Sequence, residues 1–393
     1  MRNLIYIAAV FFSVLIFPSK SETAELERKT AWKGTVDISE KITVPAGGIL
    51  TILPGTKVVF HKGGEIVCRN GTLDAVDAEF ESDYRSENHF FSFESSNVKF
   101  KNCIFRNMYP GRARYSYDKN RSFFYALYGT FSMTGCSLEK CSAIELVWIE
   151  KSLIENNLFN DVYQRALTFR ICRNVVLLRN IFEAGNESSE LLFLNCVDDS
   201  SVILNRFYGN VRAISLKDKS KGNAVISNSM FNSSIGIHVQ GQAKNNLFFG
   251  NLIFKPSSSG LNFISAGKNN IISNCVVWGA KNNGIYIGKT NDLIVRNSVF
   301  ANCKYGINIS NESEASVIEH NIIWNNNRDE KTIIEKLRLS KNLIEDPLFV
   351  DPENGNFRLQ MKSFGYNENS PLLNAGYPDG SSIGLFLSFK SQK

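Results

Sequence analysis

A short motif recurs in this chain about every 23 residues between Asn102 and Asn321. It consists of asparagine, any residue, an apolar residue and an aromatic residue. The seven complete matches begin at Asn102, Asn156, Asn205, Asn228, Asn251, Asn297 and Asn321. Weaker matches at Gly135, Arg179 and Asn274 fall on the same grid. A period of this length is typical of stacked-repeat proteins, in which each repeat contacts only its neighbours.

The content of one repeat indicates the kind of stack. In one repeat, residues 293–295, 298–300 and 306–309 are separate stretches in which apolar residues alternate with others. Alternation with a period of two predicts β-strands, and no stretch has room for a helix of about ten residues. Paired strands lie about 4.8 Å apart, so each coil adds that length to the stack. The sequence therefore predicts an all-β parallel solenoid of about ten to twelve coils.

Two inward-facing columns of side chains are expected along the stack. Asparagine at a bend tolerates the left-handed conformation, and stacked amides can hydrogen-bond as a ladder. The aromatic residue three positions later is then expected inside, where each ring stabilises the fold by about 2 kcal/mol. This aromatic column comprises Phe105, Phe159, Phe182, Tyr208, Phe231, Phe254, Phe300 and Trp324. The second column comprises Ile144, Leu167, Ile214, Ile237, Leu261, Ile285 and Ile307.

The chain divides into four predicted parts. Residues 1–24 are predicted to be a secretory signal peptide, because Arg2 precedes an apolar stretch at residues 4–17. The alternative, a membrane anchor, needs about 20 apolar residues. Residues 25–96 are predicted to form an N-terminal cap and the first coils, 97–345 the β-helix repeats, and 346–393 a C-terminal capping segment. We therefore expect no membrane span in the mature chain, and a secreted, periplasmic or cell-surface location.

Charge limits the possible partners. The 44 basic and 38 acidic residues give a net charge of +6, which permits an acidic polymer as partner without requiring one. Basic residues are scattered and no nucleic-acid-reading motif occurs, so nucleic acid is not an expected partner.

The eight cysteines follow the repeat, which favours buried thiols acting as small apolar side chains. Cys172 and Cys196 lie one coil apart, a separation that would also suit a disulfide. No cysteine or histidine spacing resembles a zinc site, and only four histidines are present. The sequence therefore predicts neither a metal site nor a cofactor.

Motifs on both flanks of the repeats carry a family resemblance. Residues 42–60 contain apolar runs broken by Pro-Gly turns, residues 346–359 read DPLFVDPENGNFRL, and residues 370–376 read SPLLNAG. Together with the repeats, they resemble exported bacterial right-handed parallel β-helix repeat proteins of the pectate-lyase-like superfold. The resemblance implies a single right-handed β-helix with caps at both ends, export, and a leaning toward polysaccharides. The catalytic signatures of polygalacturonases, alginate epimerases and pectate lyases are missing, so no reaction is implied.

The candidate site lies on the outward face of the strand that contains the second inward column. Alternation places Glu145, Thr168, Ser215, His238, Asn262, Tyr286 and Asn308 on this face. Basic residues near the middle of the stack can hold a uronate or sulfate group. The candidate substrate-binding residues are Arg165, Arg170, Arg212, Lys217, His238 and Tyr286. The alternative is an ordinary solvated face of a sheet.

These features predict an exported protein that binds an acidic polysaccharide along this face; whether it also modifies the polymer stays open. An enzyme of this kind would be a lyase, an epimerase or a glycoside hydrolase. A lyase could use Arg170 or Lys217 with His238 as base. Hydrolysis needs two carboxylates, and this face shows one acid, Glu145. One alternative is a noncatalytic cell-surface or adhesion scaffold. Another is a metal-handling periplasmic β-helix, which the few His and Met residues disfavour. The longest departure from the repeat, residues 108–122, is rich in Arg and Tyr and is a further binding candidate.

Overall fold

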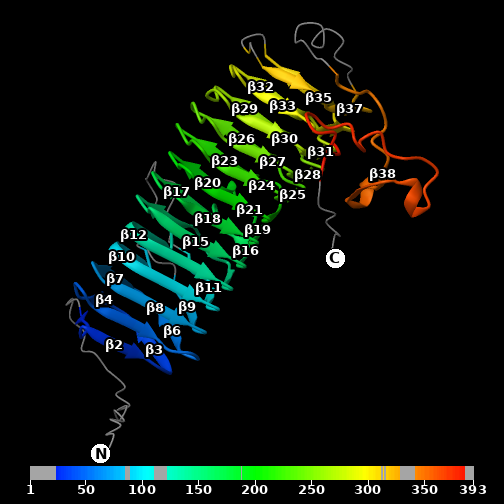
Figure 1. Ribbon diagram of the computed structural model, residues 1–393. Helices are drawn as coiled ribbons and strands as arrows, with labels where there is room; N and C mark the ends of the chain where they lie inside the picture. Colours follow the sequence, from blue (N-terminus) through cyan, green and yellow to red (C-terminus); the bar gives the residue numbers. More distant parts are fainter. Residues whose placement is uncertain are drawn as a thin grey trace, which may run out of the picture.

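The computed structural model describes residues 24–84, 89–109, 122–186, 188–310, 313, 316–327 and 341–385. These residues form an elongated stack of about 12 coils, and the described part contains no α-helix (Figure 1). Each coil contributes strands to three rows that run along the stack, and strands of successive coils pair in parallel. The all-β parallel solenoid predicted from the period-two alternation is therefore confirmed.

The three rows are named sheets 1, 2 and 3. Sheet 1 comprises β1 (Ala24–Glu25), β4 (Lys41–Val44), β7 (Glu65–Arg69), β10 (Phe91–Lys101), β12 (Phe124–Thr134), β14 (Ile144–Val147), β17 (Leu167–Arg170), β20 (Glu190–Asn195), β23 (Arg212–Lys217), β26 (Ile235–Gln240), β29 (Ser259–Ile264), β32 (Asn283–Gly288) and β35 (Tyr305–Ile309). The long strands β10 and β12 continue into sheet 2. The other strands of sheet 2 are β2 (Lys29–Trp32), β5 (Ile49–Ile52), β8 (Thr72–Val76), β15 (Lys151–Glu155), β18 (Val175–Leu178), β21 (Ser201–Ile203), β24 (Ala224–Ile226), β27 (Leu247–Phe249), β30 (Ile271–Ser273), β33 (Ile294–Arg296) and β36 (Val317–Glu319). Sheet 3 comprises β3 (Thr35–Ile38), β6 (Lys57–Phe60), β9 (Glu79–Ser82), β11 (Ile104–Arg106), β13 (Ser137–Glu139), β16 (Leu158–Val162), β19 (Ile181–Ala184), β22 (Arg206–Tyr208), β25 (Ser229–Phe231), β28 (Leu252–Phe254), β31 (Val276–Trp278), β34 (Val299–Ala301) and β37 (Ile322–Trp324).

The second predicted inward column is confirmed along sheet 1. Its members pair with one another from coil to coil and are buried, which excludes water from the interior of the stack. Leu192, which the prediction omitted, fills the coil between Leu167 and Ile214. The column runs through Ile144, Leu167, Leu192, Ile214, Ile237, Leu261, Ile285 and Ile307.

The asparagine ladder forms. The prediction placed the left-handed bend and the ladder at one residue, but they occupy two neighbouring residues. Buried amides donate Nδ2 to the next Oδ1 at 2.9 to 3.1 Å along Asn157, Asn180, Asn205, Asn228 and Asn251. The residue before each ladder position adopts the left-handed conformation, with φ of 55° at Asn156 and at Arg179 and 57° at Leu204. Asn156 and Arg179 are therefore bend residues, and the ladder begins one residue later.

This offset splits the predicted aromatic column. The prediction is confirmed for Phe105, Phe159, Phe182 and Phe300, which are buried. The rings of Phe159 and Phe182 stack with centroids 4.7 Å apart, one coil spacing. The prediction is wrong for Tyr208, Phe231, Phe254 and Trp324, because the inward position lies two residues after the ladder asparagine. Their neighbours Phe207, Met230, Ile253 and Ile323 pack on the core instead.

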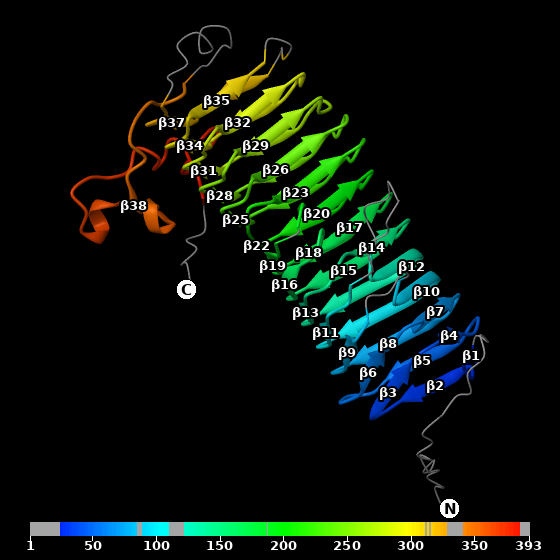
Figure 2. The same ribbon diagram turned by 180° about the vertical axis from the view of Figure 1, so that it is seen from behind.

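The C-terminal segment packs along the outer side of sheet 3 (Figures 1 and 2). It contains the antiparallel hairpin β38 (Phe349–Asp351) and β39 (Asn356–Leu359) and two 3-10 turns, η1 (Pro352–Asn354) and η2 (Lys362–Phe364). Its side chains Phe349, Phe357, Leu372 and Ile383 cluster with Leu252, Val276, Trp278, Val299, Ala301 and Ile322. Outward apolar residues of the last coils are thereby removed from water.

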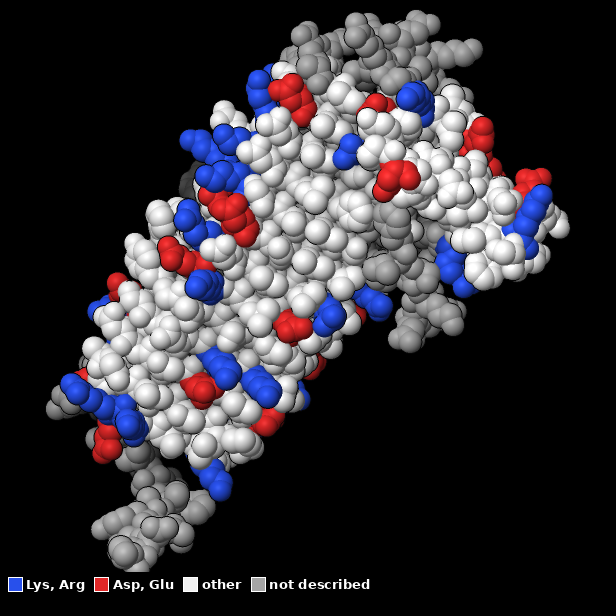
Figure 3. All heavy atoms as spheres, in the orientation of Figure 1, with Lys and Arg blue, Asp and Glu red and all other residues white. Residues whose placement is uncertain are grey.

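The outer face of sheet 2 carries few charges. Leu178, Ile203, Ile226 and Phe249 follow one another in register and are half-buried. In Figure 3 the broad middle of the molecule, where β18 to β27 are drawn in Figure 1, is correspondingly almost free of charged side chains. Charged residues gather instead along the left-hand margin of Figure 3, on the side of sheet 1.

Two predicted segments lie outside the described residues. Residues 1–23 are not described, so the signal peptide stays a prediction. Residues 110–121, most of the longest departure from the repeat, are not described either. Within the described ranges, the structure contains no helix with the length and apolar character needed to cross a bilayer.

Candidate functional site

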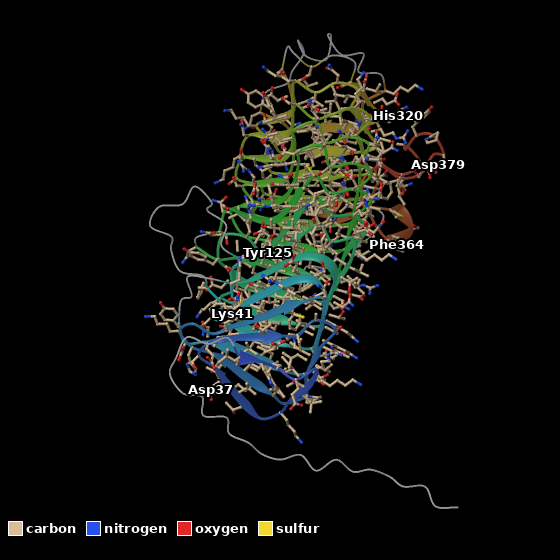
Figure 4. All side chains as sticks on the ribbon, turned by 90° about the vertical axis from the view of Figure 1, so that its left-hand side faces the viewer. Asp37, Lys41, Tyr125, His320, Phe364 and Asp379 are labelled. Atoms are coloured by element: carbon tan, nitrogen blue, oxygen red, sulfur yellow. The ribbon has the colours of Figure 1, made fainter. Side chains whose placement is uncertain are left out.

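The outward residues of sheet 1 form a single column along the stack, here called the outer column. It comprises Glu145, Thr168, Phe193, Ser215, His238, Asn262, Tyr286 and Asn308, each in register with the next. Figure 4 looks onto this side of the molecule. Tyr125, which pairs with Glu145, lies on it, whereas Phe364 and Asp379 of the C-terminal segment lie at the far edge.

The middle of the outer column is less exposed than predicted. Thr168, Ser215 and His238 are buried although they point outward from sheet 1. Asn262 and Tyr286, further along the stack, are half-buried. The open polar track predicted from the sequence therefore exists only toward the C-terminal coils.

Glu190 is the centre of the basic residues, and sequence reasoning missed it. It begins β20 and is 2% exposed. Its carboxylate forms ion pairs with Arg165 Nη2 at 2.8 Å, Arg212 Nη1 at 3.1 Å and Lys217 Nζ at 3.5 Å. Ser215 Oγ donates a hydrogen bond to its Oε1 at 3.0 Å. Three of the four predicted basic residues thus meet at one buried carboxylate, and we call this group the Glu190 cluster.

The cations determine the charge state of Glu190. Burial alone would raise the pKa of this carboxyl group. The positive charges of Arg165 and Lys217, with the hydrogen bond from Arg212, outweigh burial and hold the pKa below its ordinary value. The carboxylate is therefore ionised at neutral pH.

A signal for Glu190 was present in the sequence. Arg165, Glu190 and Arg212 each stand two residues before an inward residue of the second column, so they occupy the same place in three successive coils. The prediction overlooked Glu190 because the coil that contains it does not match the asparagine motif. An alternation of basic, acidic and basic residues at one place in a solenoid predicts ion pairs between coils.

Phe193 is the second residue that the prediction missed. The Arg165 guanidinium carbon lies 4.1 Å from the ring centroid, and Lys217 Nζ lies 5.2 Å from it. Cation–π attraction and the ion pair to Glu190 together fix the Arg165 side chain, which is only 14% exposed. The Phe193 ring thus packs against the guanidinium of Arg165 and the ammonium of Lys217 and helps to hold both in place.

Arg170 belongs to a neighbouring ion pair. Its Nε lies 2.9 Å from Oε1 of Glu145, the acidic residue predicted in the outer column. Four basic side chains and two carboxylates leave an excess of two positive charges in this region. Because Arg212 and Arg170 are 42% and 37% exposed, this excess is accessible to a ligand from solvent.

His238 lies one coil beyond Ser215 in the outer column. Burial, opposed by a hydrogen bond to Gln240 and reinforced by the charges of Arg212 and Lys217, lowers the pKa of His238. The neutral ring places its proton on Nε2, which donates to Gln240 Oε1 at 3.2 Å. Its buried Nδ1 has no hydrogen-bond partner among the described residues.

Tyr286 lies apart from the other predicted site residues. Asn262 separates it from His238 in the outer column, so it stands three coils beyond Ser215. The structure therefore brings Arg165, Arg212 and Lys217 together at Glu190, with Arg170 and His238 beside them. It does not bring Tyr286 to that cluster.

The cysteines take no part in the site. All eight are free, and seven are buried. Cys172 Sγ donates a hydrogen bond to Leu146 O at 3.3 Å, and Cys196 Sγ donates one to Asp218 O at 2.7 Å. The disulfide between Cys172 and Cys196 that their spacing would also suit therefore does not form. Across the described residues, no group of three or more His, Cys, Asp and Glu side chains is arranged to hold a metal ion.

Comparison with family models agrees with the geometry. A model described as a right handed beta helix region matches residues 190–337, and one described as periplasmic copper-binding protein (NosD) matches residues 114–259. The chain therefore has the right-handed parallel β-helix fold, and the resemblance inferred from the sequence is confirmed for the fold. No curated protein sequence matches the chain.

Solved structures of the same fold include proteins that act on or bind sugars. The periplasmic alginate epimerase AlgG is 15% identical, with 72% of this chain and 76% of that chain covered and a TM-score of 0.62. The tailspike protein of E. coli bacteriophage HK620, in a double mutant, is 11% identical, with 76% and 60% covered and a TM-score of 0.53. At such low identity the likeness establishes the fold alone.

Proposed function

We propose that the outer face of sheet 1 binds an acidic polysaccharide. The Glu190 cluster carries this proposal, because it holds cations in fixed positions while part of each remains open to solvent. Fixed cations lose little conformational entropy when they bind an anion. The exposed guanidinium of Arg212 can meet a carboxylate or sulfate with two parallel hydrogen bonds, and the ammonium of Lys217 is beside it.

The outer column favours a polymer over a small anion. Toward the C-terminal coils it presents the half-buried side chains of Asn262, Tyr286 and Asn308, one coil or about 4.8 Å apart, which suits the extended repeat of a sugar chain. The HK620 tailspike, also a β-helix, has been solved as a mutant in complex with a pentasaccharide, at 10% identity and a TM-score of 0.50. This supports a carbohydrate partner, and the positive excess supports an acidic one.

We place this function outside the cytoplasm. The predicted signal peptide supports export, as do the periplasmic description of one matching family model and the periplasmic alginate epimerase of similar fold. Secretion, the periplasm and the cell surface are all compatible with this support.

The environments of the Glu145 and Glu190 carboxylates favour binding without catalysis. Glu145 and Glu190 are each paired with arginine, and the pKa of Glu190 is lowered, whereas the general acid of a glycosidase needs a raised pKa. His238 is buried, so its free Nδ1 is not open to substrate. The same pairing favours the second candidate function, a noncatalytic cell-surface or adhesion scaffold.

A binding screen with matched variants tests the proposal. Purified protein is titrated with polygalacturonate, alginate and a neutral dextran, and ultraviolet absorbance is followed for unsaturated products. We expect binding of an acidic polymer only, weaker at high salt, and weakened in Arg212→Ala and in Lys217→Met. The control is Arg106→Ala, because Arg106 is also ion-paired and partly exposed but lies on sheet 3. Equal weakening by the control, or binding to no acidic polymer, would refute the proposal.

A further inference from the structure

The phenol end of Tyr286 lies over Gly288 of its own strand, in space that a side chain at Gly288 would fill. A Cβ built at Gly288 would lie 2.9 Å from Tyr286 Cε1, 3.1 Å from its Oη and 3.2 Å from its Cζ. Contacts below about 3.4 Å crowd van der Waals radii, so any other residue there would push the ring away. Glycine is therefore needed at this position for the space that it leaves to the ring.

The outward side of this ring is a platform. Tyr286 belongs to the outer column and is half-buried, whereas Gly288 beneath it is buried. The ring thus covers Gly288, and part of it is exposed to solvent. Aromatic rings held in this way offer a flat apolar surface for the C–H face of a sugar.

A hydrogen-bond acceptor stands beside the platform. Asn262 precedes Tyr286 by one coil, and its buried Oδ1 has no hydrogen-bond partner among the described residues. On the other side, Asn308 donates Nδ2 to Asn283 Oδ1 at 2.8 Å and is already engaged. Like His238 Nδ1, Asn262 Oδ1 is buried and is not open to a ligand, so the half-buried Tyr286 ring is the part of this region that can contact a sugar.

The platform and the Glu190 cluster lie at a separation that a glycan can span. Ser215, at the cluster, and Tyr286 are three coil steps apart, about 14 Å along the stack. A sugar unit in an extended chain is nearly as long as one coil step. An oligosaccharide of about four units would therefore reach from one to the other.

We infer that the site has two ends, and that its ligand is an oligosaccharide with an acidic unit at Arg212 and Lys217 and a ring stacked on Tyr286 about three units further along. This inference rests on the proposed function. It adds a second contact, between Tyr286 and a sugar ring of the ligand that lies beyond the reach of Arg212 and Lys217. Fragments shorter than about four units can occupy one end only. Tyr286 thereby determines the length of ligand that binds tightly.

A series of galacturonate oligomers from monomer to hexamer tests this inference by calorimetric titration of the full chain. We expect the affinity of the parent protein to rise sharply between dimer and tetramer. In Tyr286→Ala the tetramer should bind about three- to tenfold more weakly while the dimer is unaffected. Gly288→Ala should have the same effect by displacing the ring, and Tyr286→Phe should bind like the parent because it keeps the stacking surface.

The outcomes separate the inference from the proposed function. Equal affinity for monomer and hexamer, together with normal binding by Tyr286→Ala, would overturn the inference while a loss of binding in Arg212→Ala would still support the function. If no galacturonate oligomer binds to the parent protein, the inference fails, and the proposed function fails as well when alginate also does not bind. Thermal unfolding of each variant checks that a loss of binding does not reflect loss of the fold.

Discussion

Replacement of Glu190 by glutamine should destabilise the middle of the stack. Glutamine has nearly the same shape but no charge, so Arg165, Arg212 and Lys217 lose their common partner. Arg212 and Lys217 can turn toward solvent, but Arg165 is trapped against the Phe193 ring. Removing one partner of a buried ion pair typically costs about 3 to 5 kcal/mol. Since only one of the three cations stays buried, we expect about 3 kcal/mol.

The lowered pKa of Glu190 also determines how the free energy of unfolding depends on pH. The folded-state pKa of Glu190 lies below its ordinary value of 4.5. Its contribution to the free energy of unfolding is therefore complete above pH 4.5 and is lost as the pH falls through the lower folded-state pKa. The stability of Glu190→Gln should lack this part of the acid dependence.

Urea unfolding followed by circular dichroism measures the difference, and hydrogen exchange locates it. Exchange should accelerate in β17, β20 and β23 and not in β4 to β8, because a solenoid loses stability coil by coil. The control is Glu155→Gln, whose partner Arg179 is mostly exposed, and we expect a change below about 1 kcal/mol. If Glu190→Gln unfolds at the same urea concentration as this control, the reasoning about a buried cluster is refuted.

Three further predictions concern the fold. The pKa of His61 is raised, chiefly by its hydrogen bond to Asp37 and further by Asp83. These contacts should therefore stabilise the N-terminal coils fully below pH 6.5 and less as the pH rises through the folded-state pKa. His61→Gln should abolish this pH dependence in thermal melts, and an unchanged pH profile would contradict the prediction. Asn228→Ala should cost about 2 to 4 kcal/mol in urea unfolding, because it leaves the amide hydrogens of Asn205 and the carbonyl of Val202 without their partner; the exposed Asn282→Ala should be neutral, and equal effects would argue against the ladder. Ile307→Asp places a charge inside the last coils and should cost several kcal/mol, about 3 or more, whereas the same charge at an exposed position, Asn282→Asp, should cost little; similar melting of both variants would mean that the inward assignment is wrong.

The fold could be predicted because a solenoid repeats its physical requirements at every coil. Period-two alternation and the column from Ile144 to Ile307 lie in short strands whose register is fixed by burial on one face, and the structure confirms both. The aromatic column was only half right. Adjacent residues such as Phe207 and Tyr208 are both aromatic, so composition could not decide which of them points inward, and the one-residue offset between bend and ladder decides it.

The candidate site was harder to predict because it depends on contacts between coils. The sequence identified Arg165, Arg212 and Lys217 as neighbours, but the charge that organises them comes from Glu190, in a coil that departs from the asparagine motif. The burial of His238 could not be predicted either, because alternation gives only the side of the strand on which a side chain lies, and His238 is buried on the outward side.

A crystal structure of the protein with an acidic hexasaccharide would test the central claim most directly. We expect a carboxylate of the sugar within hydrogen-bond distance of Arg212 and Lys217, and a ring of the same glycan stacked on Tyr286. A glycan seated on sheet 2 or sheet 3, or one that crosses sheet 1 without touching the Glu190 cluster, would contradict it.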